Sequence, residues 1–247
     1  MHRRMLLSAI GSNGLINLEL EGSLASITTN AQLATFLGVP LIKVRYFTNT
    51  GSLIQASIRG NYAVPAGQFE GNTTLTKFRD VGGVIETVEN RGFRNTKLTE
   101  LILPKLKYVY GSGSIGYNTL LTTINLPSLT LFGVQMFNSN TAATEIYALN
   151  LEEIGNVTTT GSNNLSGLSS LNILDLRKLK VYNNPATGYG ATAAGFNNLK
   201  SGCEIRVHIA LATANNGAVN ESLRYAKNVR GAVVKFYDDN GNYISTL

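Results

Sequence analysis

Cysteine and histidine are scarce in this sequence, and tryptophan is missing. The 247 residues include one cysteine, two histidines and no tryptophan. The single cysteine, Cys203, excludes an internal disulfide, and neither histidine has the spacing of a metal ligand. We therefore expect no metal ion, no cofactor and no disulfide-stabilised secreted module. The neighbours Ile205 and Val207 indicate that Cys203 is a buried strand thiol.

Long apolar runs and catalytic motifs are also lacking. No segment approaches the roughly 18 consecutive apolar residues of a membrane helix, so we expect no membrane insertion. No G-x-S-x-G, P-loop or H-E-x-x-H motif occurs. Gly111-Ser-Gly-Ser-Ile-Gly fits G-x-G-x-x-G without a βαβ context, which favours a glycine-rich turn. The adjacent Glu152 and Glu153 point apart on a strand, so a solvated face is favoured over an acid–base pair. The sequence predicts a protein that is not an enzyme.

Charge is sparse, with a mild positive excess. Charged residues make up 15% of the chain, and 21 Lys and Arg against 15 Asp and Glu give a net charge of +6. Such an excess favours anionic partners, for example a glycan, a lipopolysaccharide or nucleic acid. The basic residues form no dense run and do not alternate with aromatic residues, so we expect no nucleic-acid partner and a solvated, mildly basic surface.

An internal repeat runs through the middle of the chain. Leu98-Thr-Glu-Leu-Ile-Leu-Pro is followed 23 residues later by Leu121-Thr-Thr-Ile-Asn-Leu-Pro. The starts lie 22 or 23 residues apart as far as Ala143, and then 28 and 31 residues apart. The strand-like runs begin at Leu75, Leu98, Leu121, Ala143, Leu171 and Gly202, with a weaker copy at Leu53. This spacing, with LxxLxL, is typical of a leucine-rich-repeat solenoid.

Alternation within each run predicts which residues face the core. Leu101 and Leu103 fall on one face and Ile102 on the other. The inward pair should stack on its equivalents in the next repeats, so that neighbours bury one continuous core. We expect three phenylalanines to fill the far side of that core: Phe69, Phe93 and Phe137. Asparagines that suit turns follow the large apolar positions, because asparagine tolerates the left-handed region: Asn72, Asn95, Asn118 and Asn140.

The predicted fold class is a β-rich solenoid, a leucine-rich repeat with one parallel strand per coil and small α/β caps at both ends. Residues 1–52 form the N-terminal tail with a capping helix and hairpin, 53–210 the repeats, and 211–247 a C-terminal capping helix and hairpin. Met1 to Gly11 faintly resembles a signal peptide but lacks a clear cleavage site, so we expect a tail and no export signal.

The repeat unit resembles the BspA-like leucine-rich repeat, over roughly residues 53 to 210. Leu121-Thr-Thr-Ile-Asn-Leu-Pro-Ser-Leu and Gln135-Met-Phe-Asn-Ser-Asn-Thr match it best. Such repeats occur in bacterial surface adhesins and in bacteriophage virion proteins. The closing segment from Leu223 to Tyr237, with Tyr243-Ile-Ser-Thr-Leu, and the opening Arg3-Arg4-Met5 are similar to those of phage tail-associated leucine-rich-repeat proteins.

The resemblance implies a non-enzymatic structural or receptor-binding protein of a bacteriophage tail, located in the virion. It implies partners among other virion proteins or copies of the chain itself, and a host surface glycan or protein as receptor. A BspA-like adhesin at the bacterial cell surface is the alternative, and a glycan-degrading enzyme is a distant third.

Outward residues at the strand centres form the predicted contact ladder. Its members are Ser57, Arg79, Ile102, Asn125, Tyr147, Asp175 and Arg206. Neighbouring rungs should lie about 5 Å apart. The mixture suits a saccharide or a protein edge, although a solvated sheet face without function fits equally well. The polar insertions at 157–164 and 183–194 are the alternative surface. Charge reversal at Arg79 and Arg206 with Tyr147→Ala should weaken attachment and leave the fold intact.

Overall fold

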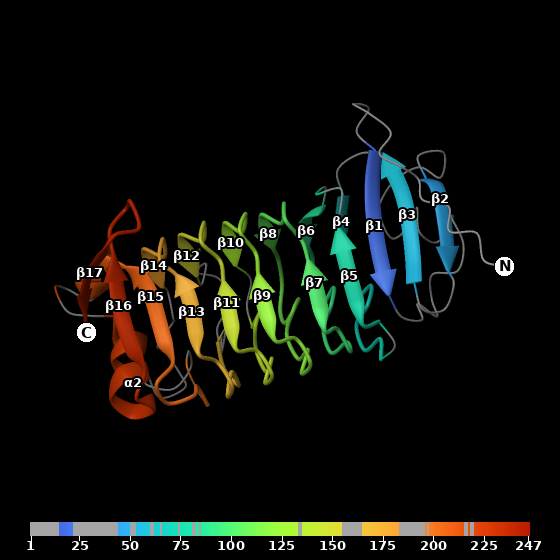
Figure 1. The fold of residues 1–247 in the computed structure, drawn as a ribbon. Coiled ribbons are helices and arrows are strands. Elements are labelled where there is room, and N and C mark those ends of the chain that lie inside the picture. The colour runs from blue at the N-terminus through green and yellow to red at the C-terminus, as the bar shows by residue number, and fades with distance from the viewer. Residues whose placement is uncertain are drawn as a thin grey trace.

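The chain folds mostly into parallel strands, and helix is confined to its C-terminal part among the described residues. The computed structural model describes residues 15–21, 44–49, 53–59, 62–64, 66–73, 75–80, 83, 85–132, 135–154, 165–182, 196, 198–214, 217 and 220–247. Figure 1 shows an elongated body with the N-terminal strands at one end and the C-terminal helix and hairpin at the other.

The strands lie in three sheets. The first has the order β2 (Val44–Asn49), β3 (Leu53–Arg59), β1 (Leu15–Glu21), β5 (Lys77–Asp80), β7 (Glu100–Ile102). The second has the order β9 (Thr123–Asn125), β11 (Glu145–Tyr147), β13 (Ile173–Leu176), β15 (Glu204–His208), β16 (Val233–Tyr237), β17 (Tyr243–Thr246). The third, which we call the back sheet, has the order β4 (Tyr62–Val64), β6 (Ile85–Val88), β8 (Tyr108–Val109), β10 (Leu131–Phe132), β12 (Glu153–Ile154), β14 (Val181–Tyr182). We call β5, β7, β9, β11, β13 and β15 the front strands.

Five successive repeats, from β5 to β14, each supply one front strand and one back strand, so the prediction of one parallel strand per coil is wrong. The second strand arises from a short apolar run after each front strand. In the run from Leu106 to Val109, both of these residues are buried. Once they hold the run against the core, its backbone groups need partners. Pairing in the back sheet provides them, since Lys107 N donates to Glu86 O at 2.9 Å.

The inward residues of the front strands are buried in register, as the alternation predicts. Ile146 lies opposite Ile124 on one side and Leu174 on the other. Ile102 is 39% exposed on the outer face, whereas Leu103 is fully buried. The predicted phenylalanines are also buried, and Phe69 and Phe93 stack at 5.4 Å between ring centroids. Neighbouring repeats therefore share one continuous core.

Buried polar side chains connect the turns on one edge of the repeats. Asn118 Nδ2 donates to Phe93 O and Ile115 O, both at 2.9 Å, and its Oδ1 accepts from Thr96 N at 2.8 Å. Asn140 Oδ1 in turn accepts from Asn118 N at 2.8 Å. Asn95 adopts the left-handed conformation on which the prediction was based, with φ 55°. Asn118 and Asn140 do not, and they serve the turns through their side chains, since each amide donates to the backbone of the preceding repeat.

The C-terminal helix and hairpin form where the sequence predicts them. Helix α2 (Glu221–Arg230) begins at Asn220, whose side chain accepts from Ser222 N, and ends at Gly231 in the left-handed conformation. The following strand β16 pairs in parallel with β15, and β17 pairs antiparallel with β16. A short 3-10 helix, η2 (Ile209–Ala212), follows β15. This end therefore continues the sheet of front strands.

The N-terminal strands differ from the sequence interpretation. The predicted hairpin is present, since β2 pairs antiparallel with β3. Strand β1, which was not predicted, lies between β3 and β5 and pairs antiparallel with both. The weaker copy at Leu53 is therefore not the neighbour of the first front strand. The predicted capping helix over residues 31–37 and both polar insertions lie outside the described residues.

Candidate functional site

The front strands bring most of the predicted ladder into register. Asn125, Tyr147, Asp175 and Arg206 lie opposite one another on successive strands. Lys235 of β16 extends this row beyond Arg206, a position that the sequence interpretation did not include.

The ladder is broken at two places. Arg79 lies opposite Ile102, but β1 takes the next place in the sheet with Glu19 opposite Arg79. Ser57 therefore pairs with Asn17 and is not a rung beside Arg79. The signal for β1 is present in the sequence, because apolar Ile16, Leu18 and Leu20 alternate with polar residues. The second break lies between Ile102 and Asn125, which belong to different sheets.

Asp175 is a rung by position but not an accessible one. Its side chain is fully buried, although its strand register puts it beside the half-buried Tyr147. Arg177 Nε donates to Oδ1 at 2.9 Å, and Arg206 Nη1 donates to Oδ2 at 3.0 Å. The two guanidinium groups therefore cover the carboxylate. Arg206 is unsuitable for a charge reversal that leaves the fold intact, because reversal would place a second carboxylate beside Asp175.

The same cations continue into a network with Glu204. Arg206 Nε donates to Glu204 Oε1 at 2.5 Å, and Lys235 Nζ donates to Oε2 at 2.6 Å. Burial acts to raise the pKa of Glu204, but these hydrogen bonds outweigh burial and hold it below its ordinary value of 4.5. The pKa of Arg206 is raised, because its bonds to Glu204 and Asp175 outweigh the opposing effect of burial.

Acid should weaken the fold partly through Glu204. Because its pKa is lower in the folded than in the unfolded state, its pairing stabilises the fold above pH 4.5 and is lost as pH falls further. We expect the urea midpoint to drop between about pH 6 and about pH 3, and to drop less in Glu204→Gln. Equal drops in the two proteins, measured by fluorescence, would show that this network does not contribute.

The second break is an interruption of the front strands between β7 and β9. At the two following junctions, Thr144 N donates to Thr122 O and Asn172 N to Thr144 O, each at 2.8 Å. Leu126 N likewise donates to Tyr147 O at 2.9 Å. The repeat register predicts equivalent bonds from Thr122 N to Thr99 O and from Leu103 N to Asn125 O. Neither bond is formed, and β7 and β9 are edge strands of two separate sheets.

The interruption is confined to the front of the molecule. In the back sheet, Thr130 N donates to Lys107 O at 2.9 Å. At the end of the front strands, Ser128 Oγ donates to Pro104 O at 2.7 Å, and the Thr96–Asn118 bonds join the turns before them. The opening between β7 and β9 is therefore a short slot that is closed at both ends.

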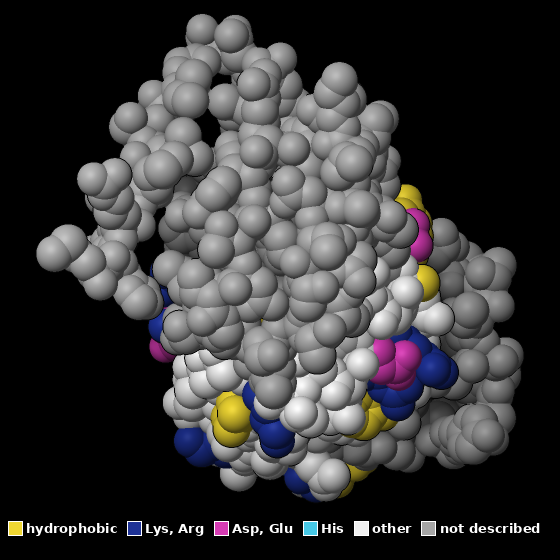
Figure 2. Space-filling model, turned by 90° about the vertical axis from the view of Figure 1, so that its right-hand side faces the viewer, with side chains coloured by type: hydrophobic (Ala, Val, Ile, Leu, Met, Phe, Trp, Pro, Cys, Tyr) yellow, Lys and Arg dark blue, Asp and Glu magenta, His cyan; other side chains and the backbone are white. Residues whose placement is uncertain are grey.

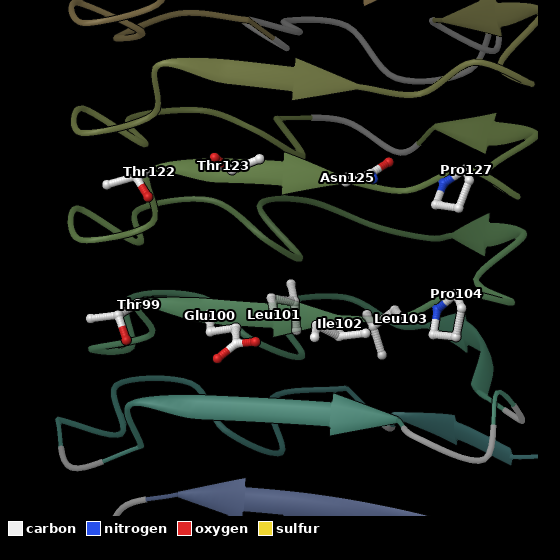
Figure 3. Close-up of a pocket in the computed structure, with 10 residues that line it drawn as sticks. All are labelled: Thr99, Glu100, Leu101, Ile102, Leu103, Pro104, Thr122, Thr123, Asn125 and Pro127. Carbon is white, nitrogen blue, oxygen red and sulfur yellow. The ribbon is translucent and has the colours of Figure 1, made fainter.

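A cavity of about 360 Å³ occupies this slot. Its lining residues within the described ranges come from these two repeats: Thr99, Glu100, Leu101, Ile102, Leu103, Pro104, Thr122, Thr123, Asn125 and Pro127. Figure 3 shows them on the two strands, which are visibly farther apart than β9 is from its other neighbour. Leu101 in the slot is 7% exposed, whereas the equivalent Ile146 is fully buried, so the cavity reaches the core. Ladder residues Ile102 and Asn125 stand on its two sides.

Charges of opposite sign lie close together on the surface. Glu100 Oε2 accepts from Arg79 at 2.6 Å, and Glu70 lies 3.4 Å from Arg94. On the end of the molecule seen in Figure 2, acidic and basic side chains lie side by side at the left edge and at the right, whereas further basic side chains along the lower edge have no acidic neighbour in this view. Ion pairs therefore neutralise only part of the positive charge on this face.

The other sequence motifs have structural roles. Gly111 has φ 74°, and a Cβ there would lie 2.4 Å from Asn90 Cβ, so a turn packed on its neighbour requires glycine. Cys203 is buried, as expected, and burial raises the pKa of its thiol to about 12. His208 ends β15, and its Nδ1 accepts from Ala210 N at 3.1 Å.

The described part of the chain holds no group of three or more His, Cys, Asp or Glu side chains placed to bind a metal ion. Within the same ranges, no helix has both the length and the apolar character needed to cross a membrane. Comparison of the chain with protein-family models, with curated proteins and with solved structures finds no match in any of the three.

Proposed function

We propose that this chain is a recognition protein of a bacteriophage tail, built as a BspA-like leucine-rich-repeat solenoid and without enzymatic activity. The observation that carries the proposal is the outer face of the front strands. Side chains from separate repeats stand there in register, and the slot beside them exposes backbone groups of two strands. Such a surface offers many contacts on a rigid scaffold, as recognition of an extended partner requires.

The solenoid interpretation is supported by the registers of both kinds of strand. Apart from β7 and β9, consecutive front strands from β5 to β15 pair with each other, and back strands pair likewise in the back sheet. A chain that advances by one strand spacing in each repeat produces these pairings. The resemblance of the repeats and of the C-terminal segment to phage tail-associated proteins supports the virion location, with other virion proteins or further copies of the chain as partners.

The attachment surface is tested by removing front-face side chains. Because Tyr147 and Asn125 are outward neighbours on adjacent front strands, we expect Tyr147→Ala with Asn125→Ala to weaken attachment about tenfold. The matched control is Tyr108→Ala with Tyr110→Ala on the opposite side, where the rings are 38% and 48% exposed. The assay is binding of each folded protein to host-envelope fragments. Equal weakening by the two variants, or none by the first, would contradict a front-face site.

A further inference from the structure

The separation of β7 and β9 limits what the slot can hold. Directly bonded strands lie about 4.8 Å apart, and an additional strand between them requires about 9.6 Å. The closest Cα atoms of β7 and β9 lie within 8 Å. If one hydroxyl oxygen stands between the strands, two hydrogen bonds replace one direct bond, and the distance between the two strands becomes about 7.5 Å. The slot is therefore too narrow for an inserted strand and suits a row of hydroxyl groups.

The backbone groups that face the slot are complementary to hydroxyls. A hydroxyl both accepts and donates, so one such group can accept from Thr122 N while donating to Thr99 O. A second can accept from Leu103 N while donating to Asn125 O. Thr99 and Leu103, which flank β7, are four residues apart, so the two bridging positions are separated by about 13 Å along the strand direction. A ligand that reaches both must carry hydroxyls over more than one sugar ring.

The lining selects among saccharides by charge and polarity. Its described residues include no lysine or arginine, and the carboxylate of Glu100 is bonded to Arg79. An anionic sugar therefore finds no cation among the described lining residues. Ile102, Pro104 and Pro127 offer apolar surface to the C–H faces of sugar rings, next to threonine and asparagine side chains.

We propose that this slot binds a neutral oligosaccharide, whose hydroxyls bridge the backbone edges of β7 and β9. The inference rests on the proposed recognition role and names the ligand class at its front face. All the remaining pairs of consecutive front strands from β5 to β15 are joined by direct hydrogen bonds. The bound sugar joins β7 to β9 indirectly, through its hydroxyl groups.

The test is amide NMR of the whole chain, titrated with maltotriose, cellotriose and tri-N-acetylchitotriose. In the free protein, the amides of Leu103 and Thr122 should exchange at least about 100-fold faster than those of Leu126 and Thr144, their bonded equivalents. At least one trisaccharide should shift and protect the first pair, with a Kd of about 1 mM. The proposal is overturned if the amides of Leu103 and Thr122 exchange slowly in the free protein. It is also overturned if none of the trisaccharides binds at the slot and water alone fills it.

A disulfide clamp gives an independent readout. In Ile102→Cys with Asn125→Cys, oxidation draws the strands to about 6 Å and closes the slot. The oxidised protein should bind at least about tenfold more weakly than the same protein reduced. The control pair, Glu145→Cys with Ile173→Cys, joins strands already in register outside the slot and should bind equally in both states. If the oxidised clamp binds as tightly as the reduced one, the slot is not the binding site.

Detection of the chain in purified virions does not depend on these results. Failure of the slot proposal therefore leaves the proposed virion role unaffected.

Discussion

Replacement of Asn118 by alanine should lower the free energy of unfolding by about 4 kcal/mol, because it leaves buried backbone groups without partners. The side chain is fully buried and bonds Phe93 O, Ile115 O and Thr96 N. Alanine can replace none of these bonds. Ile115 O keeps its bond from Asn140 Nδ2, but Phe93 O and Thr96 N lose the partner that Asn118 provides. Urea unfolding monitored by circular dichroism measures the effect.

Asn150→Ala is the matched control for this change. Asn150 also connects repeats, since its Nδ2 donates to Pro127 O at 2.6 Å, but its side chain is exposed. Water replaces the lost bond there, so the change should stay within about 0.5 kcal/mol. If the two variants unfold at the same urea concentration, the buried bonds of Asn118 contribute no more to the free energy of unfolding than the exposed bond of Asn150.

Asp175→Ala should cost about 3 kcal/mol, near the lower end for breaking a buried ion pair, because both partner arginines are partly exposed to water. The buried carboxylate accepts from Arg177 and Arg206, and its removal leaves two neighbouring cations. We expect the loss to be smaller at high salt, which screens the remaining repulsion. Urea unfolding at two salt concentrations measures both effects.

The control is Asp239→Asn, which removes an aspartate from an exposed ion pair with Lys180. Asp239 is 72% exposed in its side chain, and such pairs contribute little. Its midpoint should match that of the unaltered protein. If Asp239→Asn shifts the midpoint as much as Asp175→Ala does, the buried ion pairs of Asp175 stabilise the fold no more than an exposed ion pair.

Much of the fold followed from the period of the sequence. Alternation in the run from Leu101 to Leu103 predicted correctly which side chains are buried, because a strand places successive residues on opposite faces. The helix and the hairpin predicted within residues 211–247 also form, with Asn220 capping helix α2 and β17 pairing with β16. Strand β1 was not predicted, although its apolar residues alternate, because its place in the sheet depends on pairing with β3 and β5, which are distant in the sequence.

The interruption between β7 and β9 could not be predicted from the sequence. The runs that begin at Leu98 and Leu121 are the best-matched repeats in the chain, yet their strands do not pair. A difference of a few ångströms in separation decides whether backbone bonds form, and the repeat pattern does not specify so small a difference. The burial of Asp175 was equally invisible, because Arg177, two residues along its own chain, and Arg206, on the next strand, fold over it together.

Mass spectrometry of gradient-purified phage particles tests the proposed role most directly. If the chain is a tail recognition protein, its peptides will be present in intact particles, in constant ratio to other tail proteins, and will be lost from particles without tails. Recovery of the chain only from the bacterial envelope, with a cleaved N-terminus, would contradict the virion role and would favour a cell-surface adhesin.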